Sequence, residues 1–185
     1  MRYYIGLSVT VILLILLVFL LFHGSGKSNV PTTAMPLHSY ANTNAEVRMT
    51  IDGPINANED HQQVQITANQ NVVTFDQFQG YDSTVVNQQK FVNSVNAYSA
   101  FLYALELNGF TEGNNSSVLS SEQGHCAQGD RYVFELIQGG NDLERYWATS
   151  CPKVAVSFEG NLTVMLALFE AQVPNYQTLT KNIIF

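Results

Sequence analysis

Charged side chains are scarce in this chain of 185 residues, and positive ones are the scarcest. Charged residues make up 12% of the sequence, with 15 acidic and 8 basic residues and a net charge of -7. A protein that binds nucleic acid needs a basic surface, and so does one held electrostatically at an anionic membrane. The composition therefore argues against a nucleic-acid partner and against broad electrostatic binding to a membrane surface.

Recognisable signatures of catalysis are also absent. The sequence has no Gly-x-Ser-x-Gly motif, no phosphate-binding loop and no dinucleotide fingerprint. Glu59, Asp60 and His61 lie together, but the alternating acids and obligatory glycine of an EF-hand loop are missing, so we expect a solvated loop. Asp142 and Glu144 lie at a predicted hairpin tip, where charged residues are usually just exposed. We therefore predict no catalytic residue, no cofactor and no metal site, and expect a protein that is not an enzyme.

Only two cysteines are present, Cys126 and Cys151, and they flank a predicted hairpin. Its strand-like runs, 131–137 and 143–149, surround Gly139-Gly140-Asn141, which supplies the positive φ angles that hairpin turns need. A turn centred between the two glycines places the cysteines nearly opposite each other, with Cα atoms about 4.5–5.5 Å apart. That separation suits a disulfide, which in turn indicates an oxidising, extracytoplasmic compartment.

The same hairpin carries an aromatic cluster. Counting back from the predicted turn places Tyr132 opposite Trp147, with Tyr146 next to it in the sequence. Cross-strand aromatic pairs usually stabilise a sheet by packing, and they also occur as platforms for sugars or peptides. We expect packing first and keep Tyr132, Tyr146 and Trp147 as a possible binding surface.

A long apolar run opens the chain. Residues 5–22 carry no charge, and only three small or hydroxyl residues interrupt them. With the preceding tyrosines at the interface, this run is long enough to span a bilayer as a helix. We predict a transmembrane signal anchor over 1–22, although the sequence leaves cleavage after it open. The slight positive-inside bias of Arg2 favours residues 23–185 outside the cell.

Two regions follow the anchor. Residues 23–45 are rich in Gly, Ser, Thr and Asn and lack apolar periodicity, so we predict a flexible linker. A folded domain is predicted over 46–185, where all the acids but only six bases leave a charge of -9. Besides the hairpin, periodicity predicts strands over 46–51, 64–68, 72–75, 154–158 and 178–185, and helices over 86–108 and 161–172. Gly109 is expected to end the first helix, and Asn161 to cap the start of the second. The expected fold class is α+β, a mostly antiparallel sheet with two helices packed on one face.

Scattered residue groups through 46–185 are similar to those of a known group of proteins. They are Gly80-Tyr81-Asp82, Ala97-Tyr98, Phe101-Leu102, Leu105, Gly109-Phe110-Thr111, Gly124-His125-Cys126, Gly129-Asp130-Arg131-Tyr132, Trp147, Ser150-Cys151, Phe158, Gly160, Leu168-Phe169 and Gln172-Val173-Pro174. In these the chain resembles uncharacterised, membrane-anchored, extracytoplasmic proteins of candidate-phylum bacteria of the Saccharibacteria kind. The resemblance implies the outer face of a single cell membrane and carries no activity. The order of hairpins and helices is also similar to that of emfourin-like protease inhibitors, in layout only.

The anchor, the linker and the disulfide together predict a single-pass protein of the cell membrane. Its non-catalytic domain would act as a binding or structural module at the cell envelope. Its partners would be the membrane, through residues 5–22, and an envelope protein. The alternative is an extracytoplasmic protease inhibitor that presents the loop 111–125, which an ordered, protruding loop would favour. A pilin-like subunit is disfavoured because 5–22 contain no glutamate, and an enzyme of unfamiliar type would need His61 or His125 beside a buried acid in a deep pocket.

Overall fold

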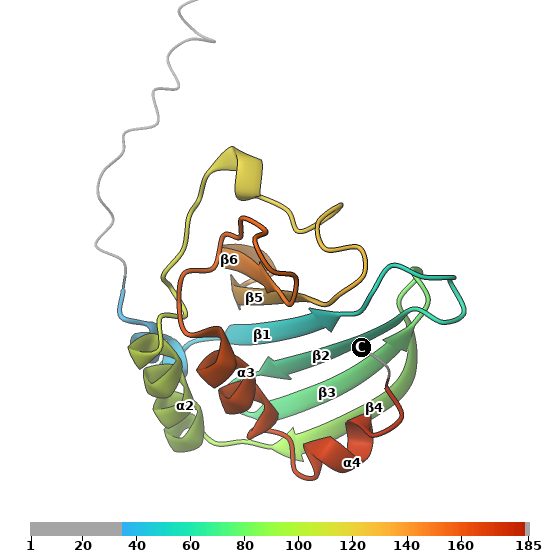
Figure 1. Ribbon diagram of the computed structural model, residues 1–185. Helices are drawn as coiled ribbons and strands as arrows, with labels where there is room; N and C mark the ends of the chain where they lie inside the picture. Colours follow the sequence, from blue (N-terminus) through green and yellow to red (C-terminus); the bar gives the residue numbers. More distant parts are fainter. Residues whose placement is uncertain (1–34, 184–185) are drawn as a thin grey trace, which may run out of the picture. The chain divides into compact units, whose positions relative to one another are not determined.

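Residues 35–183 are the part of the chain that the computed structural model describes, and they form one unit with its own hydrophobic core (Figure 1). The predicted anchor over 1–22 and the first part of the predicted linker lie outside the described residues. Within residues 35–183, no helix is long and apolar enough to cross a membrane.

Six antiparallel strands form one sheet in the order β4-β3-β2-β1-β5-β6. The strands are β1 (Ala45–Asp52), β2 (Gln62–Ala68), β3 (Val72–Gln79), β4 (Thr84–Val92), β5 (Arg131–Gln138) and β6 (Asn141–Thr149). The helices are η1 (Leu37–Asn42), α2 (Val95–Leu107), η2 (Ser117–Leu119), α3 (Leu162–Glu170) and α4 (Tyr176–Thr180). Figure 1 shows α2, α3 and α4 on one face of the sheet. The predicted α+β class with an antiparallel sheet is therefore confirmed.

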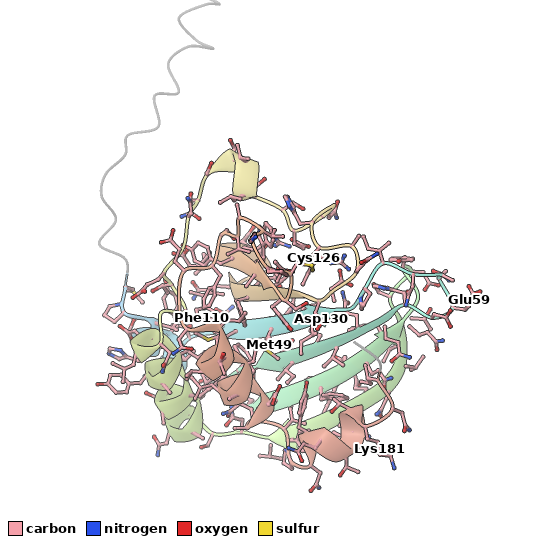
Figure 2. The ribbon with its side chains drawn as sticks, viewed as in Figure 1. Met49, Glu59, Phe110, Cys126, Asp130 and Lys181 are labelled. Atoms are coloured by element: carbon pink, nitrogen blue, oxygen red, sulfur yellow. A yellow bond between two sulfur atoms is a disulfide. The ribbon has the colours of Figure 1, made fainter. Side chains whose placement is uncertain are left out.

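The core lies between the sheet and these helices. In β1, Val47 and Met49 are fully buried on the helix side, while Glu46 and Arg48 alternate with them on the other face. Such alternation is what a sheet with one covered face requires. Figure 2 labels Met49. We call the face that turns away from α2, α3 and α4 the outer face.

The folded unit begins earlier than the sequence predicts. Residues 37–42 form η1, and Leu37 and Ala41 in it are only 1% exposed. These residues fall within the predicted linker, so the boundary at residue 46 is wrong and the compact unit starts at Met35. Two apolar side chains four residues apart are enough to hold this short helix against the core. They are too few to make a periodic pattern that the sequence could reveal in a polar segment.

The predicted helix over 86–108 is half right. Residues 84–92 form the edge strand β4, in which Phe91 faces Val73 of β3. The helix α2 begins at Val95, and the side chain of Ser94 caps it by accepting from the backbone N–H of Ala97 at 3.3 Å. Phe91 and Val95 share a helical spacing only by coincidence. The predicted end at Gly109, whose φ is +82°, is confirmed.

Two further strand predictions are wrong, and one helix prediction is right. Residues 154–158 form no strand, and only an isolated bridge joins Phe158 to Gly113. Residues 178–180 belong to α4, and the last two residues of the predicted strand lie outside the described part. The helix α3 begins after Asn161, which caps it by accepting from the backbone N–H of Val164, as the sequence predicts.

The β5–β6 hairpin turns at Gly139 and Gly140, as predicted, but its register shifts. Leu143 is an extra residue on β6, between the partners of Leu136 and Ile137. As a result Trp147 faces Val133 and not Tyr132. Because side chains alternate along a strand, a one-residue shift sends Trp147 and Tyr132 to opposite faces of the sheet. The predicted Tyr132–Trp147 pair is therefore wrong.

Candidate functional site

The predicted disulfide between Cys126 and Cys151 is confirmed. The two Cα atoms lie 5.6 Å apart, and the bond joins the segment before β5 to the segment after β6. The side of Gly129 that a Cβ would fill lies against the two sulfur atoms and the Ser150 hydroxyl. The disulfide thus holds the chain just before Asp130 in place (Figure 2).

Residues 113–130, here called the capping loop, cover part of the outer face. The indole N–H of Trp147 donates to the carbonyl of Leu119 at 2.8 Å, and the ring of His125 lies 4.9 Å from that of Trp147. Arg145 pairs with Glu122 at 2.7 Å. Figure 1 shows η2 at the loop's outermost point, above β6. The loop is ordered and buries Trp147 completely.

The three aromatic residues proposed from the sequence as a binding surface do not share one exposed surface. Trp147 is buried on the outer face, and Tyr146 is buried on the helix side, where its ring lies against Gly113. Tyr132 is half-buried on the helix side. Tyr132 borders a cavity, and a binding role remains a prediction for it.

That cavity has a volume of about 260 Å³ and lies where the end of β1 and the start of β5 meet α3 and α4. We call it the acidic cavity; its lining residues are Ile51, Asp130, Tyr132, Leu166, Glu170, Tyr176 and Thr180. Asp130 stands at its rim because its backbone is doubly held. The Ser150 hydroxyl accepts from its N–H at 2.8 Å, and the Thr149 hydroxyl donates to its carbonyl at 2.8 Å. The phenol of Tyr132 donates to Asp130 Oδ2 at 3.2 Å.

The pKa values of four titratable groups around the acidic cavity are all raised. Burial raises the pKa of the Asp130 carboxyl, and burial alone raises the pKa of the Glu170 carboxyl. Burial, followed by the charge of Asp130, raises the pKa of Tyr132 to about 12. Burial and then the charge of Glu170 raise the pKa of Tyr176. The raised pKa values mean that a negative charge in the cavity is poorly solvated. A bound cation would stabilise that charge.

The cavity's donors and acceptors indicate the kind of ligand it suits. Oδ1 of Asp130 is buried and has no hydrogen-bond donor among residues 35–183. Within that described part, no lysine, arginine or histidine lines the cavity. Two carboxyls, two phenol rings and the apolar walls of Ile51 and Leu166 together suit an ammonium or guanidinium group on a short apolar stem.

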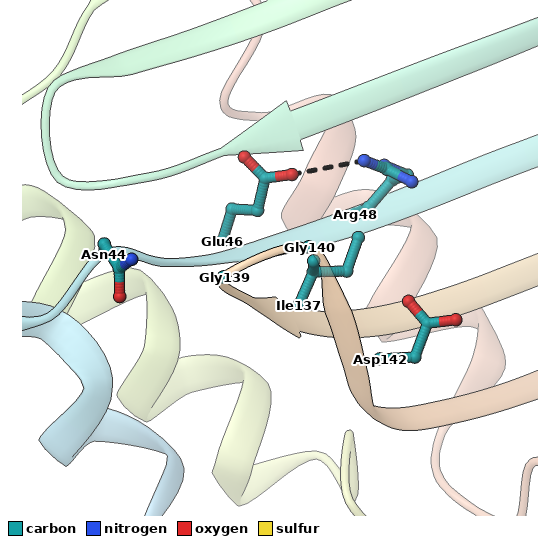
Figure 3. Close-up of a pocket in the computed structure, with 7 residues that line it drawn as sticks. All are labelled: Asn44, Glu46, Arg48, Ile137, Gly139, Gly140 and Asp142. Atoms are coloured by element: carbon teal, nitrogen blue, oxygen red, sulfur yellow. Dashed lines mark hydrogen bonds and ion pairs between the residues drawn. The ribbon is translucent and has the colours of Figure 1, made fainter.

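A second cavity, of about 340 Å³, lies beside the β5–β6 turn (Figure 3). Its charged lining residues are Glu46, Arg48 and Asp142. Arg48 pairs with Glu46 at 3.1 Å and with Glu135 at 3.5 Å. Because its one cation is already held between two carboxylates, this cavity is the weaker candidate.

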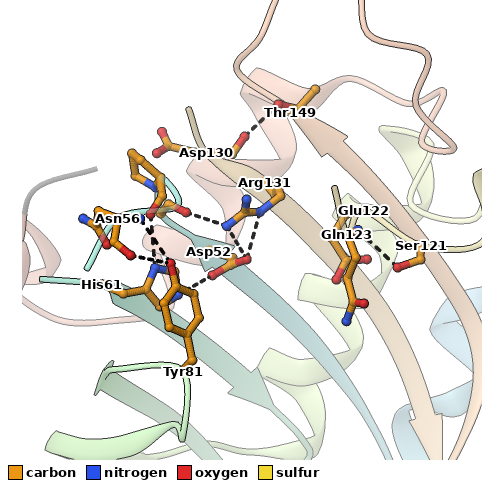
Figure 4. Close-up of polar contacts among 12 residues, drawn as sticks. Asp52, Asn56, His61, Tyr81, Ser121, Glu122, Gln123, Asp130, Arg131 and Thr149 are labelled. Carbon is orange, nitrogen blue, oxygen red and sulfur yellow. Dashed lines mark hydrogen bonds and ion pairs between the residues drawn. The ribbon is translucent and has the colours of Figure 1, made fainter. Parts of the chain in front are cut away.

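A buried polar network closes the end of the sheet next to the β1–β2 loop (Figure 4). Arg131, which is 2% exposed, pairs with Asp52 Oδ2 at 2.6 Å. His61, which is 3% exposed, stacks on Tyr81 with ring centroids 4.1 Å apart. Its Nε2 lies 3.0 Å from Asp52 Oδ1, but not in the direction that a hydrogen bond needs. The expected solvated loop is therefore wrong for His61, which helps to hold the loop against the sheet.

Neither His61 nor His125 belongs to a metal site in the described part of the chain. Residues 35–183 contain no group of three or more histidine, cysteine or acidic side chains placed to hold a metal ion. Both histidine rings pack against other protein side chains. His61 lies against Tyr81 and beside Asp52, and His125 lies against Trp147.

Comparisons with known proteins add no family to this picture. No protein-family model matches the sequence, and no curated protein matches it significantly.

Proposed function

We propose that this chain is a binding module displayed at the cell envelope, and that the acidic cavity receives a cationic group of its partner. Residues 5–22 anchor the protein in the cell membrane, and the folded unit lies outside the cell. The observation that carries the binding role is the convergence of four groups with raised pKa values on one cavity: Asp130, Tyr132, Glu170 and Tyr176. Perturbed titratable groups gather preferentially at functional sites.

The size and walls of the acidic cavity determine which part of a partner can enter it. A volume of about 260 Å³ is below that of a pocket for a whole drug-sized ligand. It suits one protruding side chain or head group, so the rest of the partner lies on the surface around it. A protonated amine is stabilised in the cavity because Asp130 and Glu170 carry the opposite charge. The rings of Tyr132 and Tyr176 offer cation–π faces in addition.

The Cys126–Cys151 bond supports the proposed extracytoplasmic location of the folded unit. Disulfides persist in oxidising compartments and are rare in reducing ones. A membrane-impermeant amine reagent applied to intact cells tests the location, since Lys153 and Lys181 are both exposed. Labelling of these lysines before lysis is the expected result. Labelling that occurs only after lysis contradicts the proposed topology.

Binding is tested with the full chain in detergent micelles and n-butylammonium as the probe. Saturation-transfer NMR should show contact with the probe and none with n-butanol, which has the same stem without the charge. Glu170→Gln and Asp130→Asn should each weaken the signal at least tenfold. Asp142→Asn, at the other cavity, is the matched control and should leave it unchanged. Equal signals from butanol and butylammonium would refute a cation site.

The capping loop favours a second candidate, an extracytoplasmic protease inhibitor. The loop is ordered and exposes Val118, 81% accessible, at its tip. It is held on the N-terminal side of that tip by the bridge between Gly113 and Phe158, and on the C-terminal side by the Trp147–Leu119 hydrogen bond and the disulfide. If the loop inhibits, the full chain should slow a protease that cleaves after aliphatic residues, and Val118→Asp should abolish the effect. An unchanged effect in that variant would rule out the tip as the inhibitory element.

A further inference from the structure

We propose that β4 pairs with β4 of a second copy of this chain, so that two sheets join edge to edge about a two-fold axis. This inference is independent of what the acidic cavity binds. It starts from the bare edge of the sheet. β4 pairs with β3 along one side, and on its other side its backbone makes no hydrogen bond with any described residue. A row of free N–H and C=O groups is a template for another strand.

The opposite edge of the sheet is covered at Trp147. The carbonyl of Trp147 in β6 accepts from the backbone N–H groups of Ser157 and Phe158 at 3.1 and 2.9 Å. The N–H of Trp147 donates to the hydroxyl of Ser157 at 2.8 Å. A strand cannot add at this end of β6 while residues 157–158 occupy it. Pairing of β4 with β4 about a two-fold axis uses the same edge of both copies, so it gives a closed dimer.

The β4 edge is apolar at its ends and polar in the middle. Val92 is 98% exposed, and Val85 and Val86 near the other end are each about half exposed. Between them lie Asn87, Gln88, Gln89 and Lys90. An antiparallel copy of such a strand places apolar ends against apolar ends, so the edge is self-complementary.

The alternation of side chains restricts the register. Opposed residues of an antiparallel pair point to the same face, so the two-fold axis must pass beside a residue that faces its own copy. An axis at Gln89 sets Gln88 against the partner's Lys90, and it brings Val86, the bulged residue of β4, next to the partner's Val92. An axis at Lys90 would oppose two like charges, and an axis at Gln88 would set Lys90 against Val86.

Charge complementarity supports the axis at Gln89. Gln88 donates to Asp76 Oδ1 of β3 at 2.6 Å, and both side chains lie on the outer face together with Lys90. In this register the partner's Lys90 lies beside Gln88, within reach of Asp76. A lysine and a bulge on an edge strand usually prevent indiscriminate pairing. Here a correctly aligned copy brings the partner's Lys90 toward Asp76, which an unrelated apolar strand would not do, and for this reason a second copy fits better.

Oxidative cross-linking of the full chain in detergent micelles tests the pairing and its register. In Gln89→Cys the two new cysteines face each other across the axis, with Cα atoms about 5 Å apart and within disulfide reach. The native cysteines do not interfere, since both are bonded to each other. Lys90→Cys is the matched control on the same strand: its two copies are offset by two residues, beyond disulfide reach. Thr67→Cys, on the inner strand β2, is the control for random collision.

The expected result is a covalent dimer from Gln89→Cys at least tenfold more abundant than from either control. Sedimentation of the unmodified chain should give the mass of two copies, and Val92→Lys should shift it toward one. Val92 is almost fully exposed, so this variant keeps the fold, which Trp147 fluorescence checks. Equal cross-linking in all three cysteine variants overturns the proposal. A monomer in sedimentation, or β4 captured only by a different protein, overturns it as well.

Discussion

Loss of the disulfide should destabilise the domain through its unfolded state. The bond joins residues 25 apart in the sequence. In the chain-entropy model, opening a loop of that length returns enough conformational freedom to the unfolded chain to cost about 3.5 kcal/mol at 25 °C. The double variant Cys126→Ala/Cys151→Ala removes the bond without leaving a free thiol. The other contacts of the capping loop do not reduce this cost, because they are absent when the chain is unfolded.

Urea unfolding followed by tryptophan fluorescence measures the effect. Trp147 is the one tryptophan of the chain, and it is fully buried beneath the capping loop, so its emission reports both global unfolding and detachment of the loop. With a typical urea dependence of about 2 kcal/mol per molar, the midpoint should fall by roughly 2 M. The emission of the folded variant should stay blue-shifted, since Leu119 still accepts from the indole.

Two results would refute this reasoning. A loss below about 1 kcal/mol would mean that the disulfide hardly restricts the unfolded chain, contrary to the loop-closure argument. A red-shifted emission before unfolding begins would mean that the disulfide acts on the folded loop itself. A conservative variant elsewhere in the loop, Gln123→Ala, is the control and should change neither the midpoint nor the emission, because its side chain is exposed.

Other contacts of the fold lead to three further predictions. Arg131→Met should lower the free energy of unfolding by about 3 kcal/mol in urea, because it leaves the Asp52 carboxylate without its buried cation. Burial raises the pKa of Glu170 above its ordinary 4.5, so ionisation begins to oppose folding above pH 4.5 and opposes it fully once the pH exceeds the raised pKa. Glu170→Gln should therefore be more stable than the unmodified chain at pH 7, and the gain should vanish as the pH falls below about 4.5 in the same assay. Gly113→Ala should cost roughly 1–3 kcal/mol in thermal unfolding, because the added methyl group overlaps the ring of Tyr146.

Local patterns predicted the elements that depend on local chemistry. The glycine pair at 139–140 and the caps at Asn161 and Gly109 act within a few residues of themselves, and all were placed correctly. The strand β4 was missed for the opposite reason. Its polar middle has no alternation, and it is a strand because β3 pairs with it. Pairing with a distant segment overrides a weak local pattern.

The acidic cavity could not be read from the sequence. Asp130 and Tyr132 are neighbours in the chain, but Glu170 and Tyr176 come from two different helices that follow the hairpin. What makes these four groups unusual is burial, which raises the pKa of each. Burial depends on how α3 and α4 pack on the sheet, and no spacing within the chain encodes it.

A single inserted residue, Leu143, explains why the predicted aromatic surface became two separate features. If Leu143 were paired with Leu136 in a regular ladder, Trp147 would face Tyr132 on the helix side of the sheet. With Leu143 bulged out, Trp147 points to the outer face, where it holds the capping loop, and Tyr132 stays on the helix side, where it donates to Asp130. Deleting Leu143 should therefore leave Trp147 opposite Val133 and keep the capping loop and the acidic cavity, because it removes only the unpaired residue. β-bulges commonly redirect side chains next to functional sites, and this one directs one aromatic residue to each of the two surfaces proposed for binding.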